Sequence, residues 1–127
     1  MRLLLDTDVA LWAVTGSERL PERAAALILG ADEVFVSAAS VWEIAIKHAL
    51  GRGQMPVSAA MALQAFNDSG YRMLAVAASH AARVESLPLL HSDPFDRLLV
   101  AQALDEPLTL LTSDKVVAAY SDAVLLV

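Results

Sequence analysis

The sequence predicts an α/β fold in which helices cover both faces of a sheet. Short apolar runs of strand length alternate along the chain with longer amphipathic segments of helical length, which is the pattern expected when strands and helices alternate. The 127 residues are enough for one compact domain and too few for two. The chain contains no internal repeat, low-complexity tract or flexible linker, so we expect one domain over residues 1–127.

The strands are expected at short apolar runs that end at polar residues or turn formers. The first run, Leu3 to Leu5, ends at Asp6, and the second, Val34 to Val36, leads directly into a helical segment. The predicted strands are 3–5, 34–36, 73–76, 108–112 and 124–127.

Proline and glycine residues mark the ends of the predicted helices. Pro21 and Pro94 suit first turns, because proline has a fixed φ and lacks the N–H that a first turn leaves unpaired. Glycines stand at the expected C-termini of successive helices, at positions 16, 30, 51 and 70. The predicted helices lie between residues 6 and 16 and over 20–30, 39–50, 58–69, 79–87, 93–104 and 114–120, with a loop at 54–56.

The composition is strongly apolar. A hydrophobic content of 57% and a mean hydropathy of +0.52 exceed the needs of a core, so we expect a dimer face or a partner groove. No apolar stretch approaches the roughly 18 to 20 residues that span a bilayer, and Asp6 interrupts the N-terminal apolar run, so we expect neither a membrane span nor a secretory signal. Because the chain has no cysteine, thiolate and disulfide chemistry is excluded and a cytoplasmic protein is expected.

The net charge of −6 argues against a protein that coats DNA, because affinity for phosphate normally comes from Lys and Arg. The charge does not exclude a nucleic-acid enzyme. Clustered carboxylates that hold divalent cations present a locally positive face to a substrate. The positions of the acidic residues are therefore more informative than their number.

Three acidic residues lie where a strand or loop gives way to a predicted helix: Asp6, Asp96 and Asp114. In open α/β sheets ligands bind beyond the carboxyl ends of the strands, so these positions can converge. Glu43 lies within helix 39–50, on the same side as Lys47, and can point toward the same crevice. Packed carboxylates repel one another, and a divalent cation removes this conflict. With three histidines and no cysteine in the chain, Mg²⁺ or Mn²⁺ is favoured over zinc.

A site of this kind supports phosphodiester hydrolysis, because a cation lowers the pKa of a bound water and stabilises the attacking and leaving oxygens. Each acid taken alone also has a structural explanation, which remains open at this point. Glu43 and Lys47 form an ordinary i,i+4 helix pair, and Asp96 suits a first helical turn. The other acids suit helix N-caps: Asp6, Asp93 and Asp114.

Four segments together resemble the PIN-domain family, in particular the VapC-like toxins of bacterial and archaeal toxin–antitoxin pairs. They are LLLDTDVALW (3–12), VSAASVWEIAIKHALGR (36–52), HSDPFDRLLVAQAL (91–104) and LLTSDKVVAAY (110–120). Their order and spacing match the family, and together they cover nearly the whole chain. The resemblance implies a three-layer α/β/α PIN-like domain with a short, mainly parallel central sheet.

The resemblance also implies an endoribonuclease that depends on Mg²⁺ or Mn²⁺ and acts as the toxin of a toxin–antitoxin pair. The catalytic and metal-binding residues carried over by motif are Asp6, Glu43, Asp96 and Asp114. We expect the partners to be RNA, a small antitoxin protein and a second copy in a homodimer. One position departs from the family pattern: these toxins often have His in the sequence DTH, whereas this chain has Asp8, which adds negative charge near the site.

Several residues near these motifs have two interpretations each. Arg97 follows Asp96 and either contacts a substrate phosphate or buttresses a neighbouring carboxylate. Thr112 and Ser113 either hydrogen-bond water on the metal or are simply polar residues at the end of a strand. Lys47 is expected to be a surface partner of Glu43, with a phosphate contact as the alternative. Asp93 is interpreted first as the cap that orients the Asp96 helix.

The aromatic and histidine residues are expected to have no catalytic role. His48, His80 and His91 have no recognised metal-ligand spacing. Trp12 and Trp42 are expected to pack in the core or in an interface. The Ala-rich helix over 58–69 offers one side of an apolar groove for an antitoxin segment, with ordinary core packing as the alternative.

Two other functions remain open from the sequence. The segment LLLDTDV also resembles the opening of haloacid-dehalogenase-like phosphatases, in which Asp6 would be the nucleophile and Asp8 the general acid. Against this alternative, the only lysines are Lys47 and Lys115, and the chain is short for that fold. The other alternative is a non-catalytic PIN-like module that binds RNA or protein, which the retention of all four acids disfavours.

Overall fold

The computed structural model describes residues 1–51 and 55–127. Within these residues the chain forms a parallel five-stranded sheet with the order β3-β2-β1-β4-β5. The strands are β1 (Arg2–Leu5), β2 (Glu33–Ser37), β3 (Arg72–Leu74), β4 (Thr109–Thr112) and β5 (Val124–Leu126). The expected α/β class with a short, mainly parallel sheet is confirmed.

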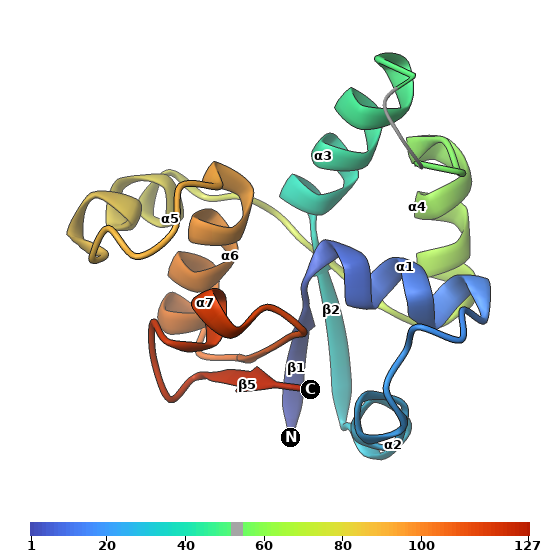
Figure 1. The fold of residues 1–127 in the computed structure, drawn as a ribbon, viewed down its shortest axis with the longest axis horizontal. Coiled ribbons are helices and arrows are strands. Elements are labelled where there is room, and N and C mark those ends of the chain that lie inside the picture. Colours follow the sequence, from blue (N-terminus) through green and yellow to red (C-terminus); the bar gives the residue numbers. More distant parts are fainter. Residues whose placement is uncertain (52–54) are drawn as a thin grey trace.

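Helices cover both faces of this sheet, which gives three layers (Figure 1). One face packs against α1 (Thr7–Thr15), α2 (Glu22–Gly30), α3 (Ala38–Ala49) and α4 (Ala59–Asp68). The other face packs against the 3₁₀ helix η1 (Val84–Ser86), α6 (Pro94–Asp105) and α7 (Lys115–Ala118), and α5 (Ala78–Arg83) packs on α6. Helix α3 rises beyond the carboxyl edge of the sheet, where it contacts both α1 and α6.

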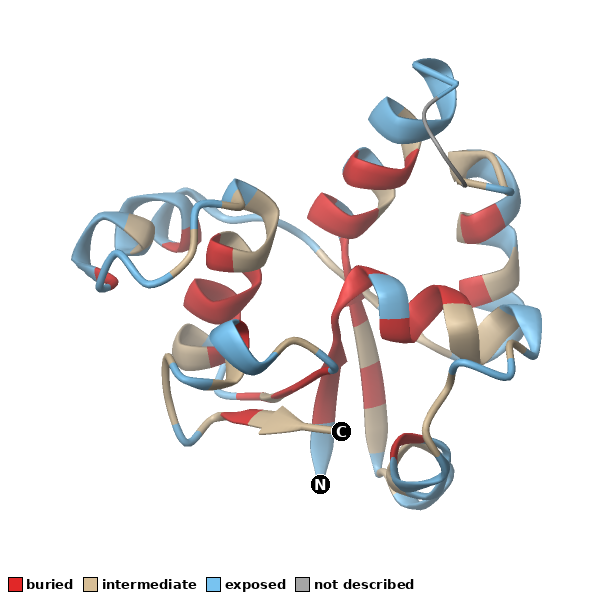
Figure 2. Ribbon diagram, viewed as in Figure 1, coloured by how far each residue is buried: buried red, intermediate tan, exposed pale blue. Residues whose placement is uncertain are grey.

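Strand β1 forms the centre of the core because it lies between β2 and β4 and is covered on both sides. Its successive side chains point to opposite faces: Leu3 and Leu5 belong to the core cluster beneath α1 to α4, and Leu4 belongs to the cluster beneath α6. All three are 0% exposed, and each contributes about 1.5–3 kcal/mol by burial. Figure 2 shows the same concentration of buried residues on β1 and on the helix turns that face the sheet.

The predicted element boundaries differ from the structure mainly in the second half of the chain. The helix expected over 79–87 is α5 followed by η1, because Pro88 disfavours helical backbone at Leu87, which is extended (φ −73°, ψ 142°). The strand expected over 73–76 is the shorter β3, and the helix expected to reach residue 120 ends at Ala118.

Two glycines end their helices as expected. Gly16 and Gly70 have φ values of +64° and +79°, a left-handed conformation that glycine adopts without steric cost. The loop expected at 54–56 lies partly outside the described residues, because these resume at Met55. Across the described part of the chain, no helix is both long and apolar enough to cross a membrane.

Candidate active site

The parallel sheet brings acidic residues from distant parts of the chain to one edge. Asp6 directly follows β1, Asp114 follows β4, and Glu43 lies on the helix that follows β2. Because β1 is paired in register with both β2 and β4, their carboxyl ends lie together. The edge contains a cavity of about 250 Å³, lined by Asp6, Thr7, Asp8, Glu43, Lys47, His91, Asp93, Asp96 and Asp114.

Asp6 is held at the base of this cavity by three hydrogen bonds. Its carboxylate accepts from the Val9 N–H at 2.8 Å, which caps α1, and its own N–H donates to the Leu111 carbonyl at 3.0 Å. The side chain is 7% exposed. Burial raises the pKa of Asp6 from 3.8 to about 7, although the hydrogen bond from the Thr112 side chain partly offsets this. The Asp6 side chain is therefore both the N-cap of α1 and a residue of the cavity.

Glu43 is fixed from two sides although it lies on a helix that rises from the sheet. Its Oε2 accepts from Lys47 Nζ at 2.6 Å, and its Oε1 lies 2.7 Å from the Thr7 hydroxyl. The Thr7 hydroxyl also lies 2.9 Å from Ser40 Oγ. Because a hydroxyl has one hydrogen, Thr7 donates to the carboxylate and accepts from Ser40. The bond to Glu43 is also the main reason that the pKa of Lys47 is raised.

Asp96 and Asp114 also line the cavity, and His91 lies between them. His91 Nε2 is 2.9 Å from Asp96 Oδ2 and 3.5 Å from Asp114 Oδ2. Asp96 is in the first turn of α6, whose N-cap Asp93 accepts from the Asp96 N–H at 3.3 Å. Asp114 caps α7 by accepting from the Val116 N–H at 2.8 Å.

The acidic residues of the cavity are not balanced by cations from the chain. Burial is the largest cause that raises the pKa of Asp96 from 3.8 to about 6, and the charges of Asp93 and Glu43 add to it. The pKa of Asp8 is also raised, first by burial and then by Glu43. Among the lining residues one lysine, Lys47, faces a larger set of carboxylates: Asp6, Asp8, Glu43, Asp93, Asp96 and Asp114. Excess negative charge on oxygen donors fits a divalent cation such as Mg²⁺ or Mn²⁺.

The structure brings the predicted set Asp6, Glu43, Asp96 and Asp114 into one cavity, but Arg97 lies outside it. The Arg97 side chain is 8% exposed, and its guanidinium donates to the carbonyls of Pro88 and Val84, each at 3.0 Å, and to the Tyr120 hydroxyl at 3.2 Å. Within residues 1–51 and 55–127 the guanidinium contacts no carboxylate, and α6 directs it away from the cavity and toward η1, so it is not placed to meet a phosphate there.

Thr112 and Ser113 have different surroundings. Thr112 is 0% exposed, and its hydroxyl donates to Asp6 while accepting from the Asp114 N–H at 3.0 Å. It therefore orients two of the acids. Ser113 is exposed and does not line the cavity.

Two further expectations are decided by packing. Asp93 is the N-cap of α6, as expected, and it also lines the cavity. Trp42 is 61% exposed and meets Phe95 edge-on with ring centroids 5.3 Å apart, so of its two expected placements the core is wrong and the interface stays a prediction. Trp12 is partly buried against the core.

Sequence reasoning missed His91 and Thr7 at this cavity. No second histidine stands at a metal-ligand spacing from His91, and its partners are instead Asp96, five residues away, and the distant Asp114. The available signal was its position two residues before the Asp93 cap. Thr7 had a weaker signal, its adjacency to Asp6. Its contact with Glu43 depends on how α1 packs against α3.

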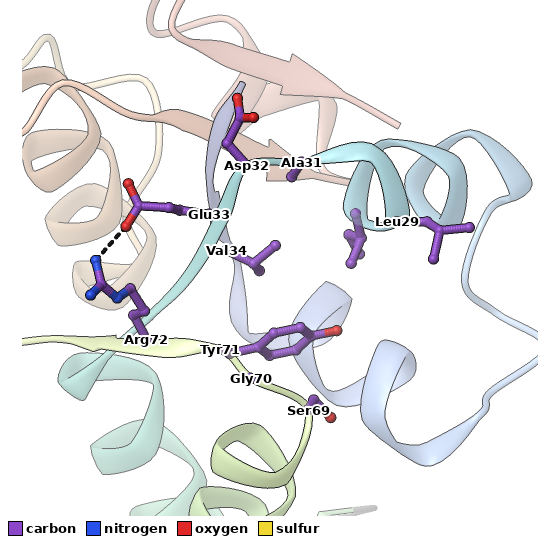
Figure 3. Close-up of a pocket in the computed structure, with 10 residues that line it drawn as sticks. Leu29, Ala31, Asp32, Glu33, Val34, Ser69, Gly70, Tyr71 and Arg72 are labelled. Atoms are coloured by element: carbon purple, nitrogen blue, oxygen red, sulfur yellow. Dashed lines mark hydrogen bonds and ion pairs between the residues drawn. The ribbon is translucent and has the colours of Figure 1, made fainter.

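A larger cavity of about 660 Å³ lies at the opposite, amino edge of the sheet, between the ends of α2 and α4. Figure 3 shows its residues, among them Val34 and Tyr71, with Glu33 bonded to Arg72. Glu33 also accepts from Arg2 Nε at 3.0 Å, and these arginines lower its pKa. The acidic group here already has cationic partners, so this cavity lacks the chemistry of the smaller one.

Comparisons with known proteins agree with this geometry. A family model described as PIN domain matches residues 3–123. The chain is 33% identical over 114 residues to a protein named Ribonuclease VapC22 from Mycobacterium tuberculosis (strain ATCC 25618 / H37Rv), an alignment that covers 89% of this chain and 87% of that one.

Solved structures share the fold at low identity. VapBC2 from Rickettsia felis, bound to a DNA fragment from its promoter, has a chain with a TM-score of 0.68 and 16% identity, covering 99% of this chain and 97% of that one. VapC20 from Mycobacterium tuberculosis, described as a Sarcin-Ricin loop cleaving toxin, has a TM-score of 0.60 and 16% identity, covering 92% and 93%.

Proposed function

The chain belongs to the PIN-domain family, and we propose that it is a metal-dependent endoribonuclease that acts as the toxin of a toxin–antitoxin pair. The observation that carries the proposal is the cavity in which Asp6, Glu43, Asp96 and Asp114 converge with one lysine for charge balance. The relative named a ribonuclease supports RNA as the substrate. Because RNA is the proposed substrate, we propose that the protein acts in the cytoplasm.

The residues of the chain hold the cation site and orient it. Asp6, Glu43, Asp96 and Asp114 would hold Mg²⁺ or Mn²⁺, which when bound supplies Lewis-acid stabilisation of the reacting phosphate and activates water. The N-cap bonds of Asp6 and Asp114 fix these carboxylates on the backbone of α1 and α7. Thr112 ties the two together. Such preorganised carboxylates need no rearrangement when substrate arrives.

Glu43 and Lys47 form an ion pair that lines the site. Lys47 is bonded to Glu43 and lies at the cavity rim, 48% exposed at its side chain, so it neutralises part of the charge of the Glu43 carboxylate. Without a cation the cavity repels the RNA backbone, because its carboxylates outnumber its lysine. Substrate binding is therefore proposed to require the loaded site.

An antitoxin and a second copy of the chain are the proposed protein partners. Structural neighbours described as toxin–antitoxin complexes support the antitoxin. On the surface of α3, Trp42, Ile46 and Leu50 recur every fourth residue and are 61%, 36% and 61% exposed. An apolar stripe of this kind supports a protein contact. Light scattering at micromolar concentration tests the homodimer, and a monomeric mass would contradict it.

The phosphatase alternative gains no support from the site. That chemistry needs a lysine free to bind a phosphate, whereas Lys47 is bonded to Glu43 and Lys115 is exposed in α7 and does not line the cavity. The non-catalytic alternative is also disfavoured, because the acids converge on one cavity.

The function is tested by RNA cleavage with the Asp96→Asn variant. Asparagine keeps the size of the side chain and removes its charge, so cleavage in Mg²⁺ or Mn²⁺ should fall by at least about 100-fold, and EDTA should abolish wild-type cleavage. Asp68→Asn is the matched control, because Asp68 is exposed at the end of α4, outside the cavity, and its carboxylate accepts from Gln64. Cleavage by wild type in metal-free buffer, or at the wild-type rate by the Asp96 variant, would contradict the proposal.

A further inference from the structure

We propose that His91 supplies a nitrogen ligand to the cation held by Asp96 and Asp114, and that this ligand makes the site prefer Mn²⁺ to Mg²⁺. The inference rests on the proposed function, since it assigns a new ligand to the same site. One donor atom each from His91, Asp96 and Asp114 lies within 4.8 Å of the others. This is the spacing expected of atoms that can share one ion.

The three side chains come from two segments that tertiary packing holds together, because His91 and Asp96 are close in sequence and Asp114 is distant. His91 is in the loop before α6, Asp96 is in the first turn of α6, and Asp114 is the N-cap of α7. His91 Nε2 lies 2.9 Å from Asp96 Oδ2 and 3.5 Å from Asp114 Oδ2. The nitrogen thus faces both carboxylates.

The backbone at His91 is anchored by residues that the proposed reaction does not otherwise use. The His91 N–H donates to the Tyr120 hydroxyl at 2.9 Å. That hydroxyl accepts in turn from buried Arg97, whose remaining donors hold the carbonyls of Val84 and Pro88. Arg97 and Tyr120 are therefore positioning residues, and they account for the burial of an arginine beside an acidic site.

The chemistry of an imidazole ligand separates the two candidate ions. Mg²⁺ takes oxygen ligands almost without exception, whereas Mn²⁺ accepts imidazole nitrogen more readily and the later first-row metals do so more strongly still. A site built from two carboxylates alone would discriminate little between Mg²⁺ and Mn²⁺. The addition of His91 shifts the preference toward Mn²⁺, while the carboxylates still allow Mg²⁺ to bind.

The experiment measures metal binding without reference to catalysis. Wild type, His91→Gln and His48→Gln are loaded with Mn²⁺, and pulsed electron paramagnetic resonance records the ¹⁴N coupling of a directly bound imidazole. His48 is the control because it is exposed on α3 and contacts the Met55 carbonyl. Calorimetry gives the Mn²⁺ and Mg²⁺ affinities of the same proteins, and circular dichroism verifies that each variant is folded.

The coupling should be present in wild type and in the His48 variant and absent in the His91 variant. Loss of even an outer partner of a metal site lowers affinity by about 10–100-fold, so His91→Gln should weaken Mn²⁺ binding by at least about tenfold. Its effect on Mg²⁺ should be smaller than about threefold, because Mg²⁺ gains little from nitrogen.

Each other outcome identifies which proposal fails. If wild type binds Mn²⁺ without ¹⁴N coupling, or if the coupling persists in the His91 variant, the ligand assignment is overturned and the ribonuclease proposal stands. If the His91 variant loses Mg²⁺ and Mn²⁺ affinity equally, the preference is overturned. If wild type binds neither ion, the metal-dependent function fails and the inference fails with it.

Discussion

The pKa values of acidic side chains are shifted in opposite directions at the two edges of the sheet. At the amino edge, Glu33 is bonded to Arg2 and Arg72 and Asp32 to the N-terminal ammonium, and the pKa of each carboxyl is lowered. At the carboxyl edge, burial and neighbouring carboxylates raise the pKa of Asp6 to about 7 and of Asp96 to about 6. At the amino edge each of these acids has a cationic partner, whereas at the carboxyl edge one lysine, Lys47, faces six carboxylates.

The difference shows that charge balance locates the site better than cavity size does. The amino-edge cavity is the larger, at about 660 Å³ against about 250 Å³, yet its charged groups are already paired on a solvent-exposed surface. The smaller cavity concentrates carboxylates that destabilise one another until a cation binds. Carboxylates that the cations of the chain do not neutralise form a site that can bind an added cation.

The largest difference between the two edges should appear in RNA cleavage when one acid at each edge is replaced by its neutral amide. Asp6→Asn should lower RNA cleavage in Mg²⁺ or Mn²⁺ by at least about 100-fold, because a buried ligand loses its charge while Asn still caps α1. Glu33→Gln should leave the cleavage rate within about twofold of wild type, since electrostatic effects of distant exposed charges are largely screened. Equal losses in the two variants would remove the distinction between the edges.

The raised pKa values at the carboxyl edge should make the stability of the metal-free protein depend on pH. The folded-state pKa of Asp6 lies above its unfolded value of 3.8, so the folded state binds more protons between these values and stability falls as pH rises from about 4 to 7. The shift of Asp96 to about 6 acts in the same direction. We expect the Tm of the metal-free protein to be about 5 °C or more higher at pH 5 than at pH 8.

Two measurements, one with added Mg²⁺ and one with Asp6→Asn, test whether the acids of the cavity cause this pH effect. Saturating Mg²⁺ at pH 8 should restore most of the lost Tm, because an ion that binds the folded state stabilises it. Asp6→Asn should raise the metal-free Tm at pH 8 and reduce the difference between the two pH values. The ion pairs of Asp32 and Glu33 have lowered pKa values, so their contribution is lost only at more acidic pH and does not interfere. A metal-free Tm that increases toward pH 8 would contradict the account.

A smaller effect is expected from the anchor of His91. Tyr120→Phe removes the hydroxyl that accepts from the His91 N–H and from Arg97, so the imidazole should be less well placed. We expect Mn²⁺ affinity to fall by about tenfold, the lower end of the range for outer partners of a metal site, with Mg²⁺ affinity nearly unchanged, as measured by calorimetry. An equal loss for both ions would indicate general disorder of the site.

The smallest effect should come from breaking the ion pairs of the amino edge. Arg72→Ala leaves Glu33 bonded to Arg2, and side chains 67% and 30% exposed are well solvated. Such surface pairs contribute little, so a thermal melt should shift by less than about 2 °C. A large loss of stability would show that this cavity depends on its charges as strongly as the other one.

Much of this site was predictable because its main residues lie at the junctions between elements. Asp6 directly follows β1, and Asp114 lies two residues after β4. Hydrophobic runs identify both strands, and parallel strands place their carboxyl ends at one edge. Glu43 needed the family pattern in addition, since a helical Glu beside Lys47 is otherwise an ordinary pair. The α/β class and the sheet edge that carries the acids follow from these local features.

Side-chain direction and charge state were decided by packing between distant segments. Arg97 directly follows Asp96, yet α6 sends one side chain into the cavity and the other toward Tyr120 and η1. His91 has no informative spacing and is placed between Asp96 and Asp114 only when α6 and α7 pack together. Local sequence specifies which residues end each strand, whereas burial and the distances between segments specify which acids lack a cation, because desolvation and Coulomb energies depend on neighbours that only the fold supplies.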